Sequence, residues 1–332
     1  MKRIAKITVA LLLAVAMCFS LAGCYDEDLN WSAKYDDTEL PAGAYIYYLS
    51  IAYNEAASKV STEDEVLKSE IDGTPAETWI KNRADEYVNQ YFYIQNEMKR
   101  LGLEMTDEDY STCLQTTESY WNYFGTSFEK FGIAKTSFDI AYSQYNRMYL
   151  KVFNALYGEG GENEVPESEL RQHIEDDYYD YEYFSAPLTK TDDDNKSVDL
   201  TDEEKADLKE TLEKYKTKIE SGAMTVNDAA TDYALKVQQD STYQTGIKDE
   251  NGMQSSYMPD AFISAIKEMN EGDVEVVEST KYMIVLHRLP IKDDEDTLLE
   301  SSDNRSQLLL ELKNTEYADA VSAAAQSFEG VE

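Results

Sequence analysis

The stretch YMPDAFISAIKEMNEGDVEVVESTKYMIVL, residues 257–286, decides the fold class because a helix and two strands follow one another within it. Pro259 suits the first turn of a helix, and Gly272 suits the point where the chain leaves it. Residues 274–278 and 282–289 are rich in valine, isoleucine and leucine and flank a short polar segment, so they predict a strand pair joined by a turn. A helix followed by antiparallel strands indicates an α+β fold.

Met258 and Phe262 lie four residues apart in this stretch, so both side chains project from one face of the helix. Two apolar side chains on one face either line a slot that is open to a ligand or pack into the core. The spacing fits both interpretations, and we keep the slot as the hypothesis and the core as its alternative.

The segment upstream adds a strand and two helices. YDYEYFSAPL, residues 179–188, is short and aromatic and predicts a strand. Thr201 and Glu204 have the spacing of a capping box, which predicts the start of a helix that ends before Gly222. A further helix is expected from Val226 to Lys236. With the first stretch, these elements predict a compact β-α-α-α-β-β unit over residues 179–292.

Helical patterns dominate the chain on both sides of this unit. Apolar residues in 80–101 recur at spacings of three and four, which predicts an amphipathic helix. Thr106 and Asp109 predict a capping box at the start of the next helix. The same periodicity predicts helices over 137–157, 167–179 and 305–328. We therefore predict a mostly helical domain made of residues 44–178 together with 295–332.

The N-terminal residues have the features of a secretory signal. A positively charged start is followed by an apolar run shorter than the roughly 20 residues that span a bilayer. Leu21-Ala22-Gly23-Cys24 resembles a bacterial lipobox, which implies cleavage after Gly23 and lipidation of Cys24. The alternative is an ordinary signal peptide with a coincidental cysteine. We expect a signal peptide over 1–23, an acidic tether over 24–43, and an extracytoplasmic protein anchored by lipid to the bacterial cell membrane.

The charge and the cysteines exclude several classes of protein. The chain carries a net charge of −36, and removal of residues 1–23, which hold three positive charges and no negative one, brings it to −39. Such a chain is repelled by nucleic acid and by anionic lipid, so we exclude nucleic-acid binding. Loss of Cys18 and lipidation of Cys24 leave Cys113 alone, so no intramolecular disulfide is available. We expect Cys113 to be a small buried residue.

The acidic run DDDNKSVDLTDEE, which starts at Asp192, has part of the spacing of a calcium loop. However, Lys196 takes a ligand position and Ser197 replaces the glycine that the sharp turn requires. A solvated loop is the better interpretation. We expect no metal and no cofactor.

The layout of the chain resembles that of the PrsA/SurA-type extracytoplasmic foldases, in which a parvulin (PpiC-like) prolyl isomerase unit is inserted into a helical chaperone domain. Residues 257–286 carry the most specific part of the resemblance. Parvulins have a Met, a Phe four residues later, an apolar residue before a Gly, and then two strands. Here these residues are Met258, Phe262, Met269 and Gly272. The resemblance implies an α+β fold, with a SurA-N-like domain, an inserted parvulin-like unit and a returning C-terminal helix, in which Met258 and Phe262 line the proline pocket.

The polar half of the parvulin site is missing from this sequence. The family's two histidines align with Tyr183 on the opening strand and Met283 on the closing strand, and its Ser and Asp align with Ala234 and Lys236. His287 lies four residues past Met283, roughly 13 Å along a strand, so it does not replace either histidine. The parvulin-like unit is therefore degenerate, and we name no catalytic residue.

These features predict a membrane-anchored chaperone or foldase that binds unfolded, proline-containing secreted polypeptides. An apolar slot that binds a twisted amide better than a planar one lowers the isomerisation barrier without a nucleophile. Whether this unit is a weak or inactive peptidyl-prolyl cis-trans isomerase is therefore left open. The alternatives are an active though atypical isomerase, and a surface lipoprotein for adhesion or solute capture.

Three tyrosine-rich runs, residues 45–53, 86–94 and 178–184, bear on how clients would be held. Tyrosine combines an apolar face with a hydroxyl, which suits tolerant contact with extended chains. The runs predict either an aromatic cradle for clients or the ordinary core of a helical protein.

Overall fold

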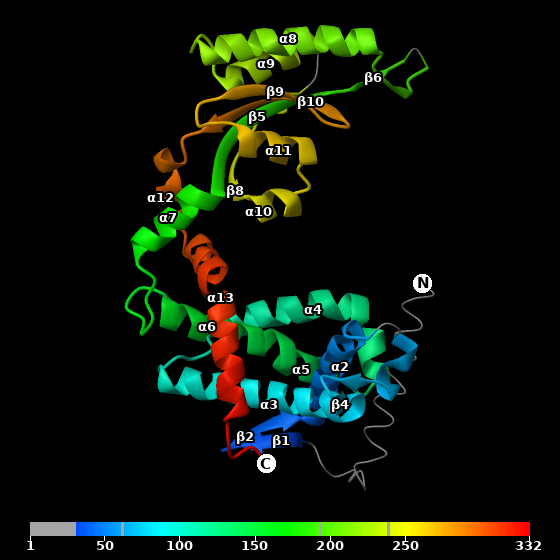
Figure 1. Cartoon of the computed structure of the whole chain (residues 1–332), viewed down its shortest axis with the longest axis vertical. Helices are drawn as coiled ribbons and strands as arrows, with labels where there is room; N and C mark the ends of the chain where they lie inside the picture. Colours follow the sequence, from blue (N-terminus) through cyan, green and yellow to red (C-terminus); the bar gives the residue numbers. More distant parts are fainter. Residues whose placement is uncertain (1–30, 61–62, 193, 238–239) are drawn as a thin grey trace. The chain divides into compact units, whose positions relative to one another are not determined.

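The computed structural model describes residues 31–332 except 61–62, 193 and 238–239, and the signal segment with Cys24 lies outside these residues. The chain divides into two compact units (Figure 1). The first extends to Glu164 and includes Leu309–Glu332, and the second is Val165–Leu308. Helix and antiparallel sheet are both present, which confirms the mixed helix and sheet class.

The first unit is built mainly from helices. Its helical elements are α2 (Ala42–Ser58), η1 (Glu63–Lys68), α3 (Ala76–Arg100), α4 (Asp107–Lys130), α5 (Lys135–Phe138), η2 (Asp139–Gln144), α6 (Tyr145–Tyr157) and the part of α13 (Ser302–Gln326) from Leu309 onward. Gly102, in a left-handed conformation, follows the end of α3 as predicted. The capping box of Thr106 and Asp109 is present at the start of α4.

The helix predicted over 137–157 is interrupted by a π-helical segment, η2. Asp139 is buried there and accepts hydrogen bonds from the Thr117 hydroxyl and the Gln144 side-chain amide, each at 2.6 Å. A π-turn inserts one residue into the repeat of three and four, and a shift of one position is within the ordinary scatter of apolar spacings, so the pattern did not reveal it.

The predicted acidic tether is wrong for residues 31–43. β1 (Trp31–Tyr35) and β2 (Thr38–Pro41) pair as a hairpin, and α2 begins at Ala42. Ala33 and Leu40 are buried, and the backbones of Lys34 and Glu332 exchange two hydrogen bonds of 2.9 Å. The polar composition concealed the alternate apolar residues that this hairpin buries. A second short hairpin is formed by β3 (Glu70–Ile71) and β4 (Thr74–Pro75).

The second unit contains a four-stranded antiparallel sheet in the order β8-β5-β10-β9. Its strands are β5 (Tyr178–Pro187), β8 (Gln244–Asp249), β9 (Val274–Glu278) and β10 (Tyr282–Leu289), and β6 (Thr189–Thr191) pairs with β7 (Ser197–Asp199) in a separate hairpin. Its helices are α7 (Glu167–Asp177), α8 (Asp202–Glu220), α9 (Val226–Val237), α10 (Glu250–Ser255), α11 (Asp260–Glu268), η3 (Ile291–Asp293) and α12 (Glu295–Glu300), followed by the first turns of α13.

Helices cover both faces of this sheet (Figure 1). On one face, Phe184, Met283 and Val285 pack with buried residues of α8 and α9. On the other, Tyr181 and Ile284 pack with Met253 of α10 and with Phe262 and Ile266 of α11. The strands therefore present alternate residues to two separate apolar cores.

Several elements of this unit were not predicted, among them β8 and α10. β8 is polar and only partly buried, so it lacks the alternation that reveals a strand. α10 has six residues, too few to show a helical period, and begins where the Asp249 side chain accepts a hydrogen bond from the Gly252 N–H at 2.7 Å. In addition, α7 was expected in the helical domain but lies in the second unit, where Arg171 pairs with Glu295 of α12 at 2.5 Å.

Candidate functional site

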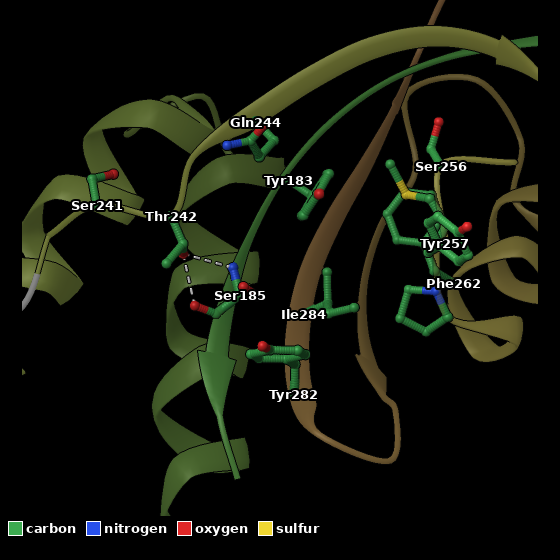
Figure 2. A pocket seen from close by; sticks show the side chains of 12 residues that line it. Tyr183, Ser185, Ser241, Thr242, Gln244, Ser256, Tyr257, Phe262, Tyr282 and Ile284 are labelled. Atoms are coloured by element: carbon green, nitrogen blue, oxygen red, sulfur yellow. Dashed lines mark hydrogen bonds between the residues drawn. The ribbon is translucent and has the colours of Figure 1, made fainter. Parts of the chain in front are cut away.

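A cavity of about 480 Å³ lies on the α11 side of the sheet (Figure 2). None of its lining residues carries a charge at neutral pH, and they come from β5, the start of β8 and the residues just before it, β10, and the stretch from the end of α10 into α11. They are Tyr183, Ser185, Ser241, Thr242, Gln244, Ser256, Tyr257, Met258, Pro259, Phe262, Tyr282 and Ile284. Neutral walls in a chain with a net charge of −36 suit an uncharged ligand.

The register of β5 and β10 sets the floor of the cavity. Ser185 is opposite Ile284, and Tyr183 is opposite Leu286. Because side chains two residues apart share a face, Tyr282 joins Ile284 on the cavity side. Strand alternation thus brings tyrosines of two strands to one surface.

Phe262 lies beneath this surface and exposes none of its side chain to water. Its ring packs edge-on against Tyr181 at 5.2 Å and Tyr183 at 5.1 Å between ring centroids. Met258, four residues earlier, is only half-buried. Met258 therefore forms part of the open wall, whereas Phe262 supports Tyr183 from below.

Thr242 fixes the β8 side of the cavity. Its hydroxyl accepts a hydrogen bond from the Ser185 backbone N–H at 2.9 Å and donates one to the Ser185 carbonyl at 2.7 Å (Figure 2). One side chain thereby satisfies both backbone groups of Ser185, just past the point where β8 stops pairing with β5 at Gln244 and Tyr183.

Only one of the four family positions lies at the cavity. Tyr183 lines it, but Met283 packs on the opposite face with α8 and α9. Ala234 and Lys236 belong to α9 on that same face, where the Lys236 ammonium group donates to Asp232 at 2.7 Å and to the Tyr215 hydroxyl at 2.9 Å.

Met283, which the sequence aligns with the family's second histidine, therefore lies away from the cavity. Its neighbours Tyr282 and Ile284 line the cavity instead, because successive residues of a strand point to opposite faces of the sheet. Residues 282, 284 and 286 alternate along the strand with 283 and 285, so each set lies on its own face. Both sets are apolar enough to be buried, and the sequence therefore does not show which set lines the cavity.

His287 lies away from the cavity, as predicted. It shares the α8 and α9 face with Val285, and its Nδ1 lies 2.9 Å from Glu182 Oε1. The Tyr243 hydroxyl donates to the other Glu182 oxygen at 2.9 Å. Burial acts to raise the pKa of Glu182, but the hydrogen bonds from His287 and Tyr243 outweigh it and hold that pKa below its usual value.

The tyrosine-rich runs lie largely in the core rather than on a cradle. Tyr47, Tyr48, Tyr91 and Tyr181 are all buried. Exposed apolar side chains lie instead on α4, where Tyr123 is 85% exposed. The row comprises Tyr110, Leu114, Tyr120, Tyr123 and Phe124. We call it the α4 row. The segment SYWNYF, residues 119–124, could have indicated this exposed row. It holds more aromatic side chains than a single buried face of a helix accommodates.

Cys113 is buried on α4, as predicted, with its thiol 3.5 Å from the Ser143 carbonyl oxygen. Within the described part of the chain, no helix is long and apolar enough to cross a membrane. The same residues contain no group of three or more His, Cys, Asp or Glu side chains placed to hold a metal ion.

No protein-family model matches this chain, and a search of curated proteins found no match either. Solved structures of foldase protein PrsA are similar to it. The Streptococcus pneumoniae structure is 13% identical at a TM-score of 0.39, covering 76% of this chain and 89% of its own. The Lactococcus lactis structure is 12% identical at a TM-score of 0.37, and the match covers 90% of this chain and 93% of that structure's chain.

The Bacillus subtilis PrsA structure is 15% identical at a TM-score of 0.34, covering 80% of this chain and 92% of its own. Likeness at these TM-scores establishes neither the fold nor the activity of this chain. The function is therefore inferred from the residues at the cavity and on α4.

Proposed function

We propose that this protein is an extracytoplasmic chaperone of the foldase type that holds unfolded secreted polypeptides. The observation that carries the proposal is the cavity with uncharged, tyrosine-rich walls on the sheet of the second unit. Tyrosine and methionine offer apolar contact with little demand for a particular ligand shape, and a wall hydroxyl can serve a peptide group. Such a surface suits short uncharged segments of many different chains.

The same residues favour holding over catalysis. None of the lining side chains ionises near neutral pH, and burial raises the pKa of Tyr183 further. The Thr242 hydroxyl is already engaged on both sides by Ser185. In this proposal Met258 contacts the client and Phe262 keeps Tyr183 in place, so the cavity binds a proline-containing segment without the polar groups that the parvulin resemblance leads us to expect.

The α4 row supports the proposal from the first unit. Tyr123 is largely exposed and Phe124 is half exposed, and the Phe124 ring lies 6.4 Å from those of Tyr120 and Tyr123. A row of exposed aromatic side chains costs solubility unless it binds something apolar. We assign it to the same clients as the cavity.

The anchor is part of the proposal as well. Lipidation of Cys24 would hold the protein at the outer side of the cytoplasmic membrane, where unfolded chains emerge from the secretion machinery. Two acyl chains give stable attachment where one gives only transient binding. The strongly negative net charge leaves covalent lipid as the means of attachment, since anionic headgroups repel the chain.

Paired assays on the purified protein test this function. We expect it to suppress aggregation of a denatured secreted protein, while isomerising a proline-containing peptide barely faster than the uncatalysed reaction. Rapid isomerisation that is lost on Met258→Ala, a change at the open wall of the cavity, would instead favour an active, atypical prolyl isomerase. Absence of both activities would favour a surface lipoprotein for adhesion or solute capture.

A further inference from the structure

Tyr257 has a backbone conformation that its side chain does not favour. It follows the last turn of α10 with a φ of +57°, in the left-handed region. The other non-glycine residues in this region, within the described chain, are Asp36, Asp72 and Asn195. Aspartate and asparagine tolerate this conformation through short polar side chains, whereas a tyrosine is strained in it.

Other helices of this chain end with glycine at the equivalent place. Gly102 follows α3 and Gly222 follows α8, with φ of +66° and +70°. At the end of α10 the Tyr257 N–H donates to the Gln254 carbonyl and the Met258 N–H to the Met253 carbonyl, as in a glycine-terminated helix. The fold therefore needs a left-handed residue here, but it does not need a tyrosine.

The ring of Tyr257 gains nothing from packing that would offset this strain. It is 94% exposed, although it borders the cavity between Ser256 and Met258 (Figure 2). Tyr282, which borders the cavity from β10, is 41% exposed. Neither folding nor core packing explains a strained, exposed aromatic residue at this position, and strain of this kind concentrates where ligands are bound.

We propose that Tyr257 is the specificity-determining residue of the cavity, contacting the client directly and selecting uncharged segments over segments that carry carboxylates. This inference rests on the proposed function. The ring offers an apolar face at the mouth of a cavity whose lining holds no cation to pair with an acid. A carboxylate beside that ring would lose water and find no cation in the lining itself; the Lys248 ammonium group behind Ser256 already donates to the Ser256 hydroxyl, so the acid would have to compete for it, in a chain that is already strongly negative.

Fluorescence polarisation with two labelled peptides tests the assignment. Both have a central proline in a glycine- and serine-rich sequence, flanked by alanines in one and by aspartates in the other. We expect the full chain to bind the alanine peptide and to discriminate against the aspartate peptide. Tyr257→Gly should weaken binding of the alanine peptide roughly tenfold and reduce the discrimination, whereas Tyr257→Phe, which keeps the ring, should bind like wild type.

Thermal unfolding supplies the control. Tyr257→Gly relieves the backbone strain, so its midpoint should rise by about 2–4 °C, whereas that of Asn195→Gly, at a residue that tolerates the conformation and does not line the cavity, should change little. Asn195→Gly should leave peptide binding unchanged. If wild type and Tyr257→Gly bind the alanine peptide equally, the role of Tyr257 is overturned and the proposed function stands. Absence of binding by wild type overturns the proposed function and this inference together.

Discussion

At the scale of single residues, the sequence predicted which side chains cluster but not which of them meet water. Met258 and Phe262 both line the cavity, but Met258 precedes α11, which begins at Asp260, so the two do not share a helical face. Only Met258 is partly open, because Tyr181 and Tyr183 pack over the Phe262 ring. A spacing of four residues shows neither where the helix begins nor which residues of the facing strand pack against it. The contact of Phe262 with Tyr181 and Tyr183 of β5, which are distant in the sequence, is what buries its ring.

This difference separates the roles of the two residues. Phe262→Ala should lower the free energy of unfolding by about 3–5 kcal/mol, because it empties a fully buried site. Met258→Ala should cost about 1 kcal/mol or less, because the side chain is half exposed, and should weaken binding of an unfolded peptide several-fold. Chemical denaturation and peptide titration measure both. Peptide binding by Met258→Ala that matches wild type would count against the cavity.

Asp180 on β5 gives the second unit a dependence on pH. It is 4% exposed, and its Oδ2 has no hydrogen-bond partner within the described chain. Burial raises its pKa from 3.8 to about 7, and the negative charges of Asp294 and Glu182 act in the same direction. Since the folded-state pKa lies above the unfolded one, the stability that this group contributes is complete below about pH 4 and is lost as the pH rises through 7.

Asp180→Asn removes the charge that opposes folding at high pH. We expect the free energy of unfolding to rise by roughly 1–3 kcal/mol at pH 8 and to change little at pH 4. Denaturant titrations at the two pH values measure the difference, with Asp176→Asn on the exposed face of α7 as the control. An equal effect at both pH values would contradict the assignment.

At the scale of elements, local sequence signals predicted where helices and strands begin and end, but they did not predict which face of a strand lines the cavity. The capping boxes at Thr106 and Thr201 and the strands at 274–278 and 282–289 were predicted where the structure has them. β8 was missed because its polar sequence shows no alternation. The sequence did not show which face of the sheet Met283 occupies, because β10 is buried on both sides and its pattern does not mark an inner and an outer face.

The α4 row provides a prediction for an element rather than a residue. A double variant, Tyr123→Ser with Phe124→Ser, should leave the thermal midpoint within a few degrees, because Tyr123 is largely exposed and Phe124 is half exposed. Suppression of client aggregation should fall by at least half. Glu118→Ser with Lys130→Ser, also on α4, is the matched control and should keep full activity. Unchanged suppression in the aromatic variant would remove α4 from the binding surface.

At the scale of the whole molecule, composition excluded partners more securely than it identified them. A net charge of −36 argues against nucleic acid and anionic lipid, whereas the tyrosine content did not show that most of the conspicuous runs are buried. Composition counts side chains without placing them. Only the sheet and its covering helices distinguish the tyrosines of the cavity from those of the core.

The anchor gives a prediction that does not depend on the fold. Cys24→Ala should leave the protein unlipidated and move most of it from the membrane fraction to the medium or to the uncleaved precursor, because anionic lipid repels a chain with a net charge of −36. Cell fractionation with immunoblotting measures the shift, and Cys113→Ala should remain in the membrane fraction. Membrane retention of mature Cys24→Ala would show that something other than lipid holds the protein.

The most direct test of the account is to fill the cavity and measure binding of an unfolded, uncharged proline peptide. Ser185→Trp places a large side chain on the cavity floor, and Ser264→Trp places the same side chain on the exposed surface of α11. We predict at least tenfold weaker binding for Ser185→Trp and unchanged binding for Ser264→Trp, with both variants folded by circular dichroism. Equal affinities for the two variants would contradict the claim that this cavity holds the client.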